Sequence, residues 1–181
     1  PGAAPSACPA GFADCDGANA GGCETDLDRD TSHCGACSAP CGAGSTCVGG
    51  ACREGVVGIS AGGSHTCAWT ANGRAWCWGM NGAGQLGVPN KRAQLAPVEV
   101  VGLRDATRVA TGRYSTCMLR RSGDVRCWGA SAHGRATGAA VHARAAAVID
   151  VEHAVELAAG RDHACALRRT GGVTCWGANA A

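Results

Sequence analysis

The sequence is short of the residues from which most soluble proteins build a core. Leucine, isoleucine, valine and phenylalanine number 24 among 181 residues, about 13%, and ordinary core building becomes doubtful below roughly 20%. Only one tyrosine and one phenylalanine are present. The net charge is +2, which argues against the disorder that low hydrophobicity and high charge produce together. The chain therefore needs another source of stability.

Long apolar runs and lysine are also scarce. No stretch approaches the 18 or more apolar residues of a membrane-spanning helix, so we expect no membrane span. The positive charge is carried by scattered arginines, with Lys91 as the one lysine. Proteins that bind nucleic acids gather such charge on one face, and the sequence therefore predicts no nucleic-acid partner.

Cysteine is present in excess, with fourteen in total. An even and dense cysteine count is typical of oxidising compartments, where disulfides compensate for a thin core. Each bridge stabilises a fold by about 2–4 kcal/mol, mainly by restricting the unfolded chain. We expect the protein to be secreted, periplasmic or displayed at the cell surface, and a cytosolic metal or redox protein is the competing interpretation.

Residues 1–54 are predicted to form a mostly irregular module that disulfides hold together. No helical or alternating apolar pattern of useful length occurs there, so crosslinks are its organising feature. Eight cysteines allow 105 pairings, among which the sequence does not choose. They are Cys8, Cys15, Cys23, Cys34, Cys37, Cys41, Cys47 and Cys52.

A zinc site competes with disulfides in this module. His33, Cys34, Cys37 and Cys41 include a Cys-x-x-Cys half-site, which is common in zinc proteins. No second pair of zinc ligands stands apart from the other cysteines, and the high cysteine content indicates an oxidising compartment. We therefore favour disulfides and predict no metal site.

A calcium loop is the second competing interpretation. Asp26, Asp28 and Asp30 imitate the start of such a loop. However, Thr31 and Cys37 stand where the loop needs glycine and glutamate. The favoured interpretation is that these carboxylates cap turns. The sequence leaves calcium binding by the three residues open.

A cassette of thirteen residues occurs three times in the rest of the chain. It reads CAWTANGRAWCWG at 67–79, CMLRRSGDVRCWG at 117–129 and CALRRTGGVTCWG at 165–177. Recurrence at a period near fifty residues indicates a repeat architecture. Strand-like runs precede the cassettes at 56–59, 107–110 and 154–157, and follow the first two at 97–101 and 147–151. Each complete unit thus offers about four strands, which is the content of one propeller blade.

Each cassette is predicted to be a hairpin with a disulfide across its two strands. Folding about residues 72, 122 and 170 sets the two cysteines of each cassette opposite one another. Directly opposed residues on antiparallel strands lie roughly 4.5–5.5 Å apart at Cα, within disulfide range. The glycine after each midpoint suits a turn that needs positive φ. The predicted bridges are Cys67–Cys77, Cys117–Cys127 and Cys165–Cys175.

Other residues recur in register with the cassettes. The tryptophans are expected to pack between blades, with ligand stacking as the alternative; they are Trp78, Trp128 and Trp176. His65 and His163 align with Ser115 in the middle copy. Because a catalytic histidine could not become serine, we expect a structural hydrogen bond at this position.

Two short motifs of enzymes occur without their required context. Ser60 lies in a Gly-x-Ser-x-Gly match, but the nucleophile elbow needs a helix after the serine. Residues 82–87 match Gly-x-Gly-x-x-Gly, but neither a helix nor the later acidic residue of a dinucleotide site follows. Both are expected by chance in a chain with 29 glycines. We predict no enzyme activity, no catalytic residue and no cofactor.

The repeats resemble the regulator of chromosome condensation family. The resemblance is carried by Ala-Gly-Gly-Ser-His-Thr at 61–66 and Trp-Gly-Met-Asn-Gly-Ala-Gly-Gln-Leu-Gly at 78–87, while the middle copy departs at 130–138. It implies an all-β fold with a partial β-propeller over 55–181, divided into repeats at 55–104, 105–153 and a truncated 154–181. Because the family builds seven-bladed rings, we expect a longer protein with further repeats. Cysteines replace the family's aliphatic or small residues in the cassettes, which indicates a secreted variant.

The N-terminal segment resembles small cysteine-rich modules of secreted or surface-anchored bacterial proteins. Asp-Cys-Asp-Gly at 14–17, Gly-Cys-Glu-Thr at 22–25 and His-Cys-Gly-Ala-Cys at 33–37 carry this resemblance. It implies an extracytoplasmic setting and no activity.

The resemblance also implies a function. Family members present loops of the propeller to protein partners, so we expect a non-enzymatic, secreted or surface-displayed scaffold for protein binding. The candidate contact loops are residues 81–94 and 131–144. The alternatives are a structural or adhesive component of the cell surface and, by analogy with the family's nuclear member, guanine-nucleotide exchange. The disulfides argue against a nuclear or cytosolic GTPase partner.

Overall fold

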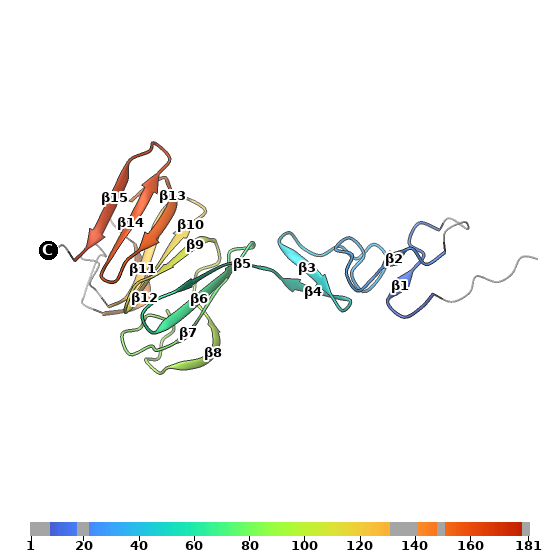
Figure 1. Ribbon diagram of the computed structural model, residues 1–181, viewed down its shortest axis with the longest axis horizontal. Coiled ribbons are helices and arrows are strands. Elements are labelled where there is room, and N and C mark those ends of the chain that lie inside the picture. The colour runs from blue at the N-terminus through green and yellow to red at the C-terminus, as the bar shows by residue number, and fades with distance from the viewer. Residues whose placement is uncertain (1–7, 18–21, 131–140, 148–150, 179–181) are drawn as a thin grey trace, which may run out of the picture. The chain divides into compact units, whose positions relative to one another are not determined.

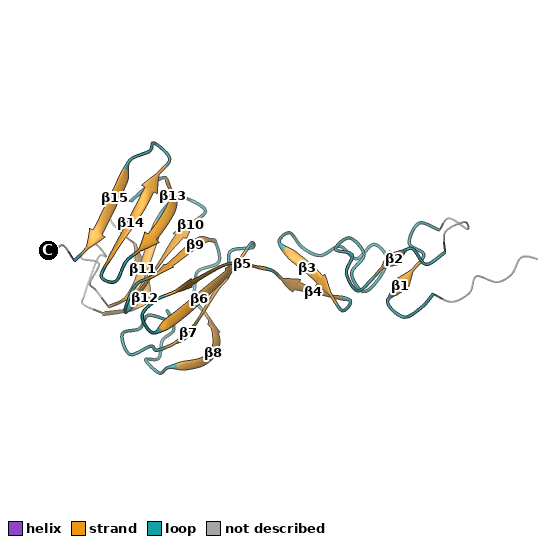
Figure 2. Ribbon diagram, in the orientation of Figure 1, coloured by secondary structure: helices purple, strands orange, loops and turns teal. Residues whose placement is uncertain are grey.

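All regular structure in the described part of the chain is β-strand (Figure 2). The computed structural model describes residues 8–17, 22–130, 141–147 and 151–178. The chain divides into two compact units, Pro1–Gly55 and Val56–Ala181. Within the described residues, no helix is long and apolar enough to cross a membrane.

The N-terminal unit has little regular structure. Two short antiparallel pairs are present, β1 (Phe12–Ala13) with β2 (Thr25–Asp26) and β3 (Ser45–Val48) with β4 (Ala51–Glu54). Among its described hydrophobic residues, only Cys34 and Cys47 are buried. The sequence left the pairing of its eight cysteines open. The structure joins them as Cys8–Cys23, Cys15–Cys37, Cys34–Cys47 and Cys41–Cys52.

The second unit consists of three antiparallel sheets, one for each repeat (Figure 1). Blade 1 contains β5 (Val56–Ala61), β6 (His65–Thr70), β7 (Ala75–Gly79) and β8 (Gln94–Glu99). Blade 2 contains β9 (Ala106–Thr111), β10 (Ser115–Arg120), β11 (Val125–Ala130) and β12 (Val141–Ala147). Blade 3 contains β13 (Ala154–Ala159), β14 (His163–Arg168) and β15 (Val173–Gly177). The first strands β5, β9 and β13 contact one another as inner strands. The predicted all-β fold with a partial propeller is confirmed.

The cassettes form the hairpins at the centre of each blade. Cys67 lies opposite Cys77, Cys117 opposite Cys127 and Cys165 opposite Cys175. Their Cα atoms are 4.1, 4.1 and 4.0 Å apart, and each pair forms a disulfide. These distances are shorter than expected because the cysteines occupy non-hydrogen-bonded positions, where opposed strands approach most closely. Gly73 closes the first turn at φ +87°, a conformation that glycine adopts without steric cost.

The outer strands overlap only part of the runs that the sequence predicted. Strand β8 overlaps the run at 97–101 but begins at Gln94 and ends at Glu99. Of the run at 147–151, Ala147 ends β12, residues 148–150 lie outside the described residues, and Val151 is not in a strand. Strand β8 is largely exposed and carries Pro97, which an edge strand tolerates. Val100 and Val151 are buried in the clusters between blades, so each predicted run also includes a residue that fills the space between blades.

The blades pack through two faces that differ in their residues. We call the side that carries the cassette cysteines the cysteine face, and the opposite side, which carries Trp128 in blade 2, the tryptophan face. Side chains from the cysteine face of blade 1 share a buried cluster with Val109, Met118 and Trp128 of blade 2. The cysteine face of blade 2 meets Leu157 and Trp176 of blade 3 in the same way. The thin core predicted from composition is thus distributed between neighbouring blades.

Candidate functional site

Three equivalent glycine turns gather at one end of the inner strands. They connect β5 to β6, β9 to β10 and β13 to β14, and they line a cavity of about 460 Å³. The turns stack closely, because Gly63 N donates to Gly112 O at 3.2 Å and Arg113 N donates to Arg161 O at 2.9 Å. A Cβ on Gly62 would lie 2.3 Å from Gly112 O, so only glycine fits there. We call this end of the second unit the glycine-turn face.

Two arginine side chains line the cavity. Arg113 and Arg161 line it, and they occupy the same position in successive repeats, where blade 1 has Gly63. The Arg113 guanidinium lies 4.8 Å from the centre of the Tyr114 ring, in the range of a cation–π contact. Arg161 Nε lies 3.2 Å from Asp162 Oδ2. The cavity is thus lined by two arginines, of which one stacks on an aromatic ring and the other pairs with a carboxylate.

An apolar side chain extends this surface outward. Met80 N donates to Ser64 O at 2.8 Å, which places Met80 beside the turn of blade 1, and its side chain is exposed. Exposed methionine, tyrosine and arginine are the residues that protein interfaces favour. Sequence reasoning missed these residues, although the recurrence of arginine two residues before Ser115 and His163 was a visible signal.

His65 joins blades 1 and 2 through a buried hydrogen-bond chain. Its Nε2 lies 2.8 Å from Thr116 Oγ1, which in turn donates to Gln85 O at 2.7 Å. Because the threonine proton is used toward Gln85, Nε2 carries the proton that bonds to Thr116, and the imidazole is neutral. Burial lowers the pKa of His65 to about 4. The expected structural hydrogen bond is present in blade 1, whereas the equivalent His163 is exposed on blade 3.

Acid should weaken the contact between blades 1 and 2 by protonating His65. The unfolded chain takes up this proton near the ordinary pKa of 6.5 and the folded chain only near 4. The contribution to stability is therefore complete above pH 6.5 and is lost as the pH falls toward 4, by about 3 kcal/mol. Urea unfolding of the wild-type chain and of His65→Gln between pH 7 and 4 measures the effect. The difference between the two proteins should change across this range, and a constant difference would refute the prediction.

The predicted contact loop at 81–94 has two parts. Its first half is buried, where Asn81 Oδ1 accepts from Leu86 N and Gln85 O accepts from the Trp128 indole at 2.9 Å. Its exposed residues are Gly82 and the tip from Pro89 to Ala93. Of the second predicted loop, residues 131–140 lie outside the described residues and 141–144 begin β12. The surface of the first loop is therefore smaller than the sequence suggested.

The two enzyme-like motifs occupy structural positions. Ser60 lies within β5, and its Oγ accepts from Thr111 N at 3.1 Å, which joins two inner strands. Residues 82–87 form the buried loop beneath Trp128, without a following helix. Neither motif has the geometry that its chemistry needs.

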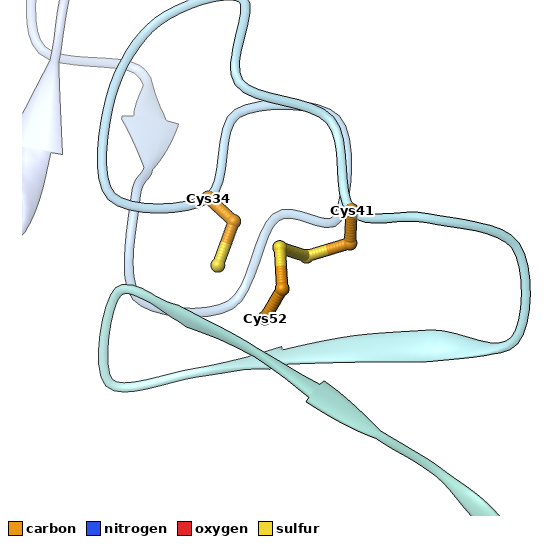
Figure 3. A group of neighbouring side chains, drawn as sticks. All are labelled: Cys34, Cys41 and Cys52. Atoms are coloured by element: carbon orange, nitrogen blue, oxygen red, sulfur yellow. A yellow bond between two sulfur atoms is a disulfide. The ribbon is translucent and has the colours of Figure 1, made fainter. Parts of the chain in front are cut away.

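The cysteines of the proposed zinc half-site form disulfides in the structure. Cys34, Cys41 and Cys52 lie close together, but the sulfurs of Cys41 and Cys52 are bonded to each other (Figure 3). Cys34 is bonded to Cys47. Zinc binds thiolates, so the disulfide interpretation is the one that the geometry supports.

Two of the three aspartates of the calcium-like run cap turns. Asp26 Oδ1 accepts from Asp28 N at 3.0 Å, and Asp30 Oδ1 accepts from Ser32 N at 2.7 Å. The bond from Ser32 holds the pKa of Asp30 below its ordinary value. Their carboxylates do not form a mutual cluster, whereas those of Asp14, Asp16 and Glu24 do. These three side chains are exposed. Asp14 accepts a hydrogen bond from Gly17 N, and Glu24 accepts one from Cys15 N.

The repeats match models of a known family. A model of the regulator of chromosome condensation (RCC1) repeat matches residues 72–119. A second model of this repeat matches residues 56–85, 106–135 and 154–181. Together the matches take in more than half of the chain. The chain belongs to the RCC1 repeat family.

Known RCC1 repeat proteins share its sequence or its fold over part of their length. The human probable E3 ubiquitin-protein ligase HERC3 is 35% identical over 79 residues, which are 42% of this chain and 8% of HERC3. The structure of human WBSCR16 superposes with a TM-score of 0.61 at 19% identity, over 82% of this chain and 41% of that protein. Yeast RCC1 (Prp20), solved bound to Kap60, superposes with a TM-score of 0.58 at 21% identity, over 70% of this chain and 34% of that one. The chain therefore spans less than half the length of each.

Proposed function

We propose that this RCC1 repeat chain is a non-enzymatic scaffold that binds a protein partner outside the cytoplasm. The observation that carries the proposal is the glycine-turn face, where Arg113 and Arg161 line a cavity and the exposed ring of Tyr114 stacks against Arg113. Arginine and tyrosine are enriched among the residues that dominate binding energy at protein interfaces. Yeast RCC1 (Prp20), which shares this fold, was solved bound to a protein, Kap60.

The setting follows from the cysteines. All fourteen are paired and none is free, a state that oxidising compartments maintain and the cytosol does not. We infer a secreted, periplasmic or surface-displayed protein. Guanine-nucleotide exchange on a cytosolic GTPase does not suit that setting.

The arrangement of Arg113 and Tyr114 supports a preformed contact site. The ring of Tyr114 holds the guanidinium on one side, so less conformational entropy is lost when a partner binds. The Gly63 turn allows Arg113 to lie close, since a Cβ on Gly63 would be 3.1 Å from Arg113 Cγ. The absence of a side chain in blade 1 thus makes room for the arginine of blade 2.

Replacing Arg113 and Tyr114 together by alanine should weaken partner binding at least tenfold, because each is a residue type whose removal costs more than about 1 kcal/mol at interfaces. The measurement captures extracellular and envelope proteins of the source organism on immobilised chain, identifies a saturable partner and determines its affinity by calorimetry. Arg121→Ala is the control, since this exposed arginine lies on a hairpin turn at the opposite end of blade 2. Equal affinities of the double variant and the control would overturn the assignment of the face. A chain that stays at the cell surface without any saturable partner would support a structural role instead.

A further inference from the structure

The cavity at the glycine-turn face is lined, among the described residues, by two basic side chains and no acidic one. Apart from Arg113 and Arg161, the lining consists of glycines, alanines and Thr111. Its volume of about 460 Å³ is that of a small ligand site. The cavity lies at the ends of the inner strands, so that neighbouring blades stand beside it and do not cover it. Its charge therefore indicates which kind of group it accepts.

Arg113 has no counter-charge within the described part of the chain. Other arginines of the second unit pair with carboxylates, as Arg74 Nη2 does with Glu99 Oε2 at 2.8 Å. The guanidinium of Arg113 instead lies against the ring of Tyr114, which attracts a cation but does not neutralise it. Arg113 is also half-buried, and a charge that is partly removed from water is stabilised by an opposite charge. A bound anion would supply that charge.

Arg161 has a nearby carboxylate that holds it weakly. Arg161 Nε lies 3.2 Å from Asp162 Oδ2, and both side chains are exposed. Exposed ion pairs of this kind stabilise little, because water screens them. Arg161 follows Arg113 in the next turn, where its carbonyl oxygen accepts from Arg113 N at 2.9 Å. An incoming carboxylate can therefore displace Asp162 in a cavity that both arginines line.

We propose that the partner bound at the glycine-turn face presents an acidic segment, with an aspartate or glutamate carboxylate placed in this cavity against Arg113 and Arg161. The inference rests on the proposed function, because it names the chemistry of that partner. A guanidinium group is a planar fork of N–H donors that matches a carboxylate with two parallel hydrogen bonds. Opposite charge also speeds the encounter of two proteins, so the same arginines raise both the rate and the strength of association.

A fluorescently labelled hexaglutamate peptide is the probe, and its anisotropy with the full 181-residue chain gives the affinity at low ionic strength, where screening is weakest. Hexaglutamine, which has the same length without charge, should not bind. Arg113→Gln and Arg161→Gln should each weaken hexaglutamate binding by about threefold or more, and the double variant by about tenfold or more, because each removes charged hydrogen bonds. Arg121→Gln is the matched control, since this exposed arginine lies in the hairpin turn at the opposite end of blade 2 and should leave the affinity unchanged.

Asp162→Asn should act in the opposite direction. The substitution removes the carboxylate that competes for Arg161, so hexaglutamate should bind about twofold more tightly. A merely structural role of these side chains does not predict such a gain. Because the altered side chains are exposed or half-buried, thermal unfolding should show unchanged folding of each variant.

Two results would overturn the inference. An equal loss of affinity in Arg121→Gln and in the cavity variants would show that the overall positive charge attracts the peptide and that the cavity does not. Absence of hexaglutamate binding, while the captured partner still binds less tightly to the chain with both Arg113→Ala and Tyr114→Ala, would mean that this face contacts its partner through other chemistry. The proposed function would then stand without the inference. Failure of the proposed function has a different result, which is that the wild-type chain captures no saturable partner.

Discussion

Reduction of the disulfides should abolish the folded structure of the N-terminal unit. Its described residues bury only Cys34 and Cys47 among hydrophobic side chains, whereas ordering each backbone residue costs about 1–2 kcal/mol. Because so little apolar surface is buried, the unit depends on its four bridges, which stabilise it by restricting the unfolded chain. Two-dimensional amide NMR in the presence of a strong reductant should therefore show that the signals of residues 8–54 lose their dispersion.

The bridges of the second unit should differ in their response to mild reduction. Cys67, Cys77, Cys117 and Cys127 are buried between blades, whereas Cys175 is exposed. Pulsed alkylation followed by mass spectrometry should label Cys175 together with the exposed cysteines of the N-terminal unit, and the buried pairs last. Early labelling of the buried pairs, with the N-terminal bridges intact, would contradict this view.

Replacing Trp128 by alanine should be the most damaging single substitution in the second unit. The indole is buried, donates to Gln85 O at 2.9 Å and packs in the cluster between blades 1 and 2. Truncation of a buried tryptophan costs about 3–5 kcal/mol, which lowers the melting temperature of a unit of this size by on the order of 10 °C or more. Differential scanning calorimetry measures the shift.

Trp78→Ala is the matched control for this substitution. Trp78 occupies the equivalent position in blade 1, where no described blade precedes it, and it is only half-buried. Its loss should cost less than half as much as the loss of Trp128. Equal shifts for the two variants would mean that the tryptophans stabilise each blade internally and do not join neighbouring blades.

The sequence predicted the centre of each blade better than its edge. The cassettes have alternating faces, a turn glycine and opposed cysteines, so local chemistry determines both strand and register. The outer strand β12 (Val141–Ala147) lacks such a pattern, because an edge strand is held mainly by backbone pairing with β11. Val151, which follows it, fills the space between blades, and the period of the sequence does not distinguish these two roles.

The candidate site was only partly visible in the sequence. The loop at 81–94 was expected to be a contact surface because it follows a cassette and the family presents such loops to protein partners. Asn81 and Gln85 instead turn inward and bond to the backbone, which a linear pattern does not reveal. Conversely, Arg113 and Tyr114 lie in a short turn. The hydrogen bond from Arg113 N to Arg161 O forms only because the blades stack.

The short sequence separation of the bonded cysteines has a consequence for how the chain folds and how its repeats evolve. Each bridge in the blades joins cysteines ten positions apart, and those of the N-terminal unit join cysteines 11 to 22 positions apart. No bridge connects one repeat to another. Oxidation can therefore proceed segment by segment, and correct pairing in one repeat does not depend on the next. A whole repeat can likewise be gained by duplication or lost by deletion without leaving an unpaired cysteine.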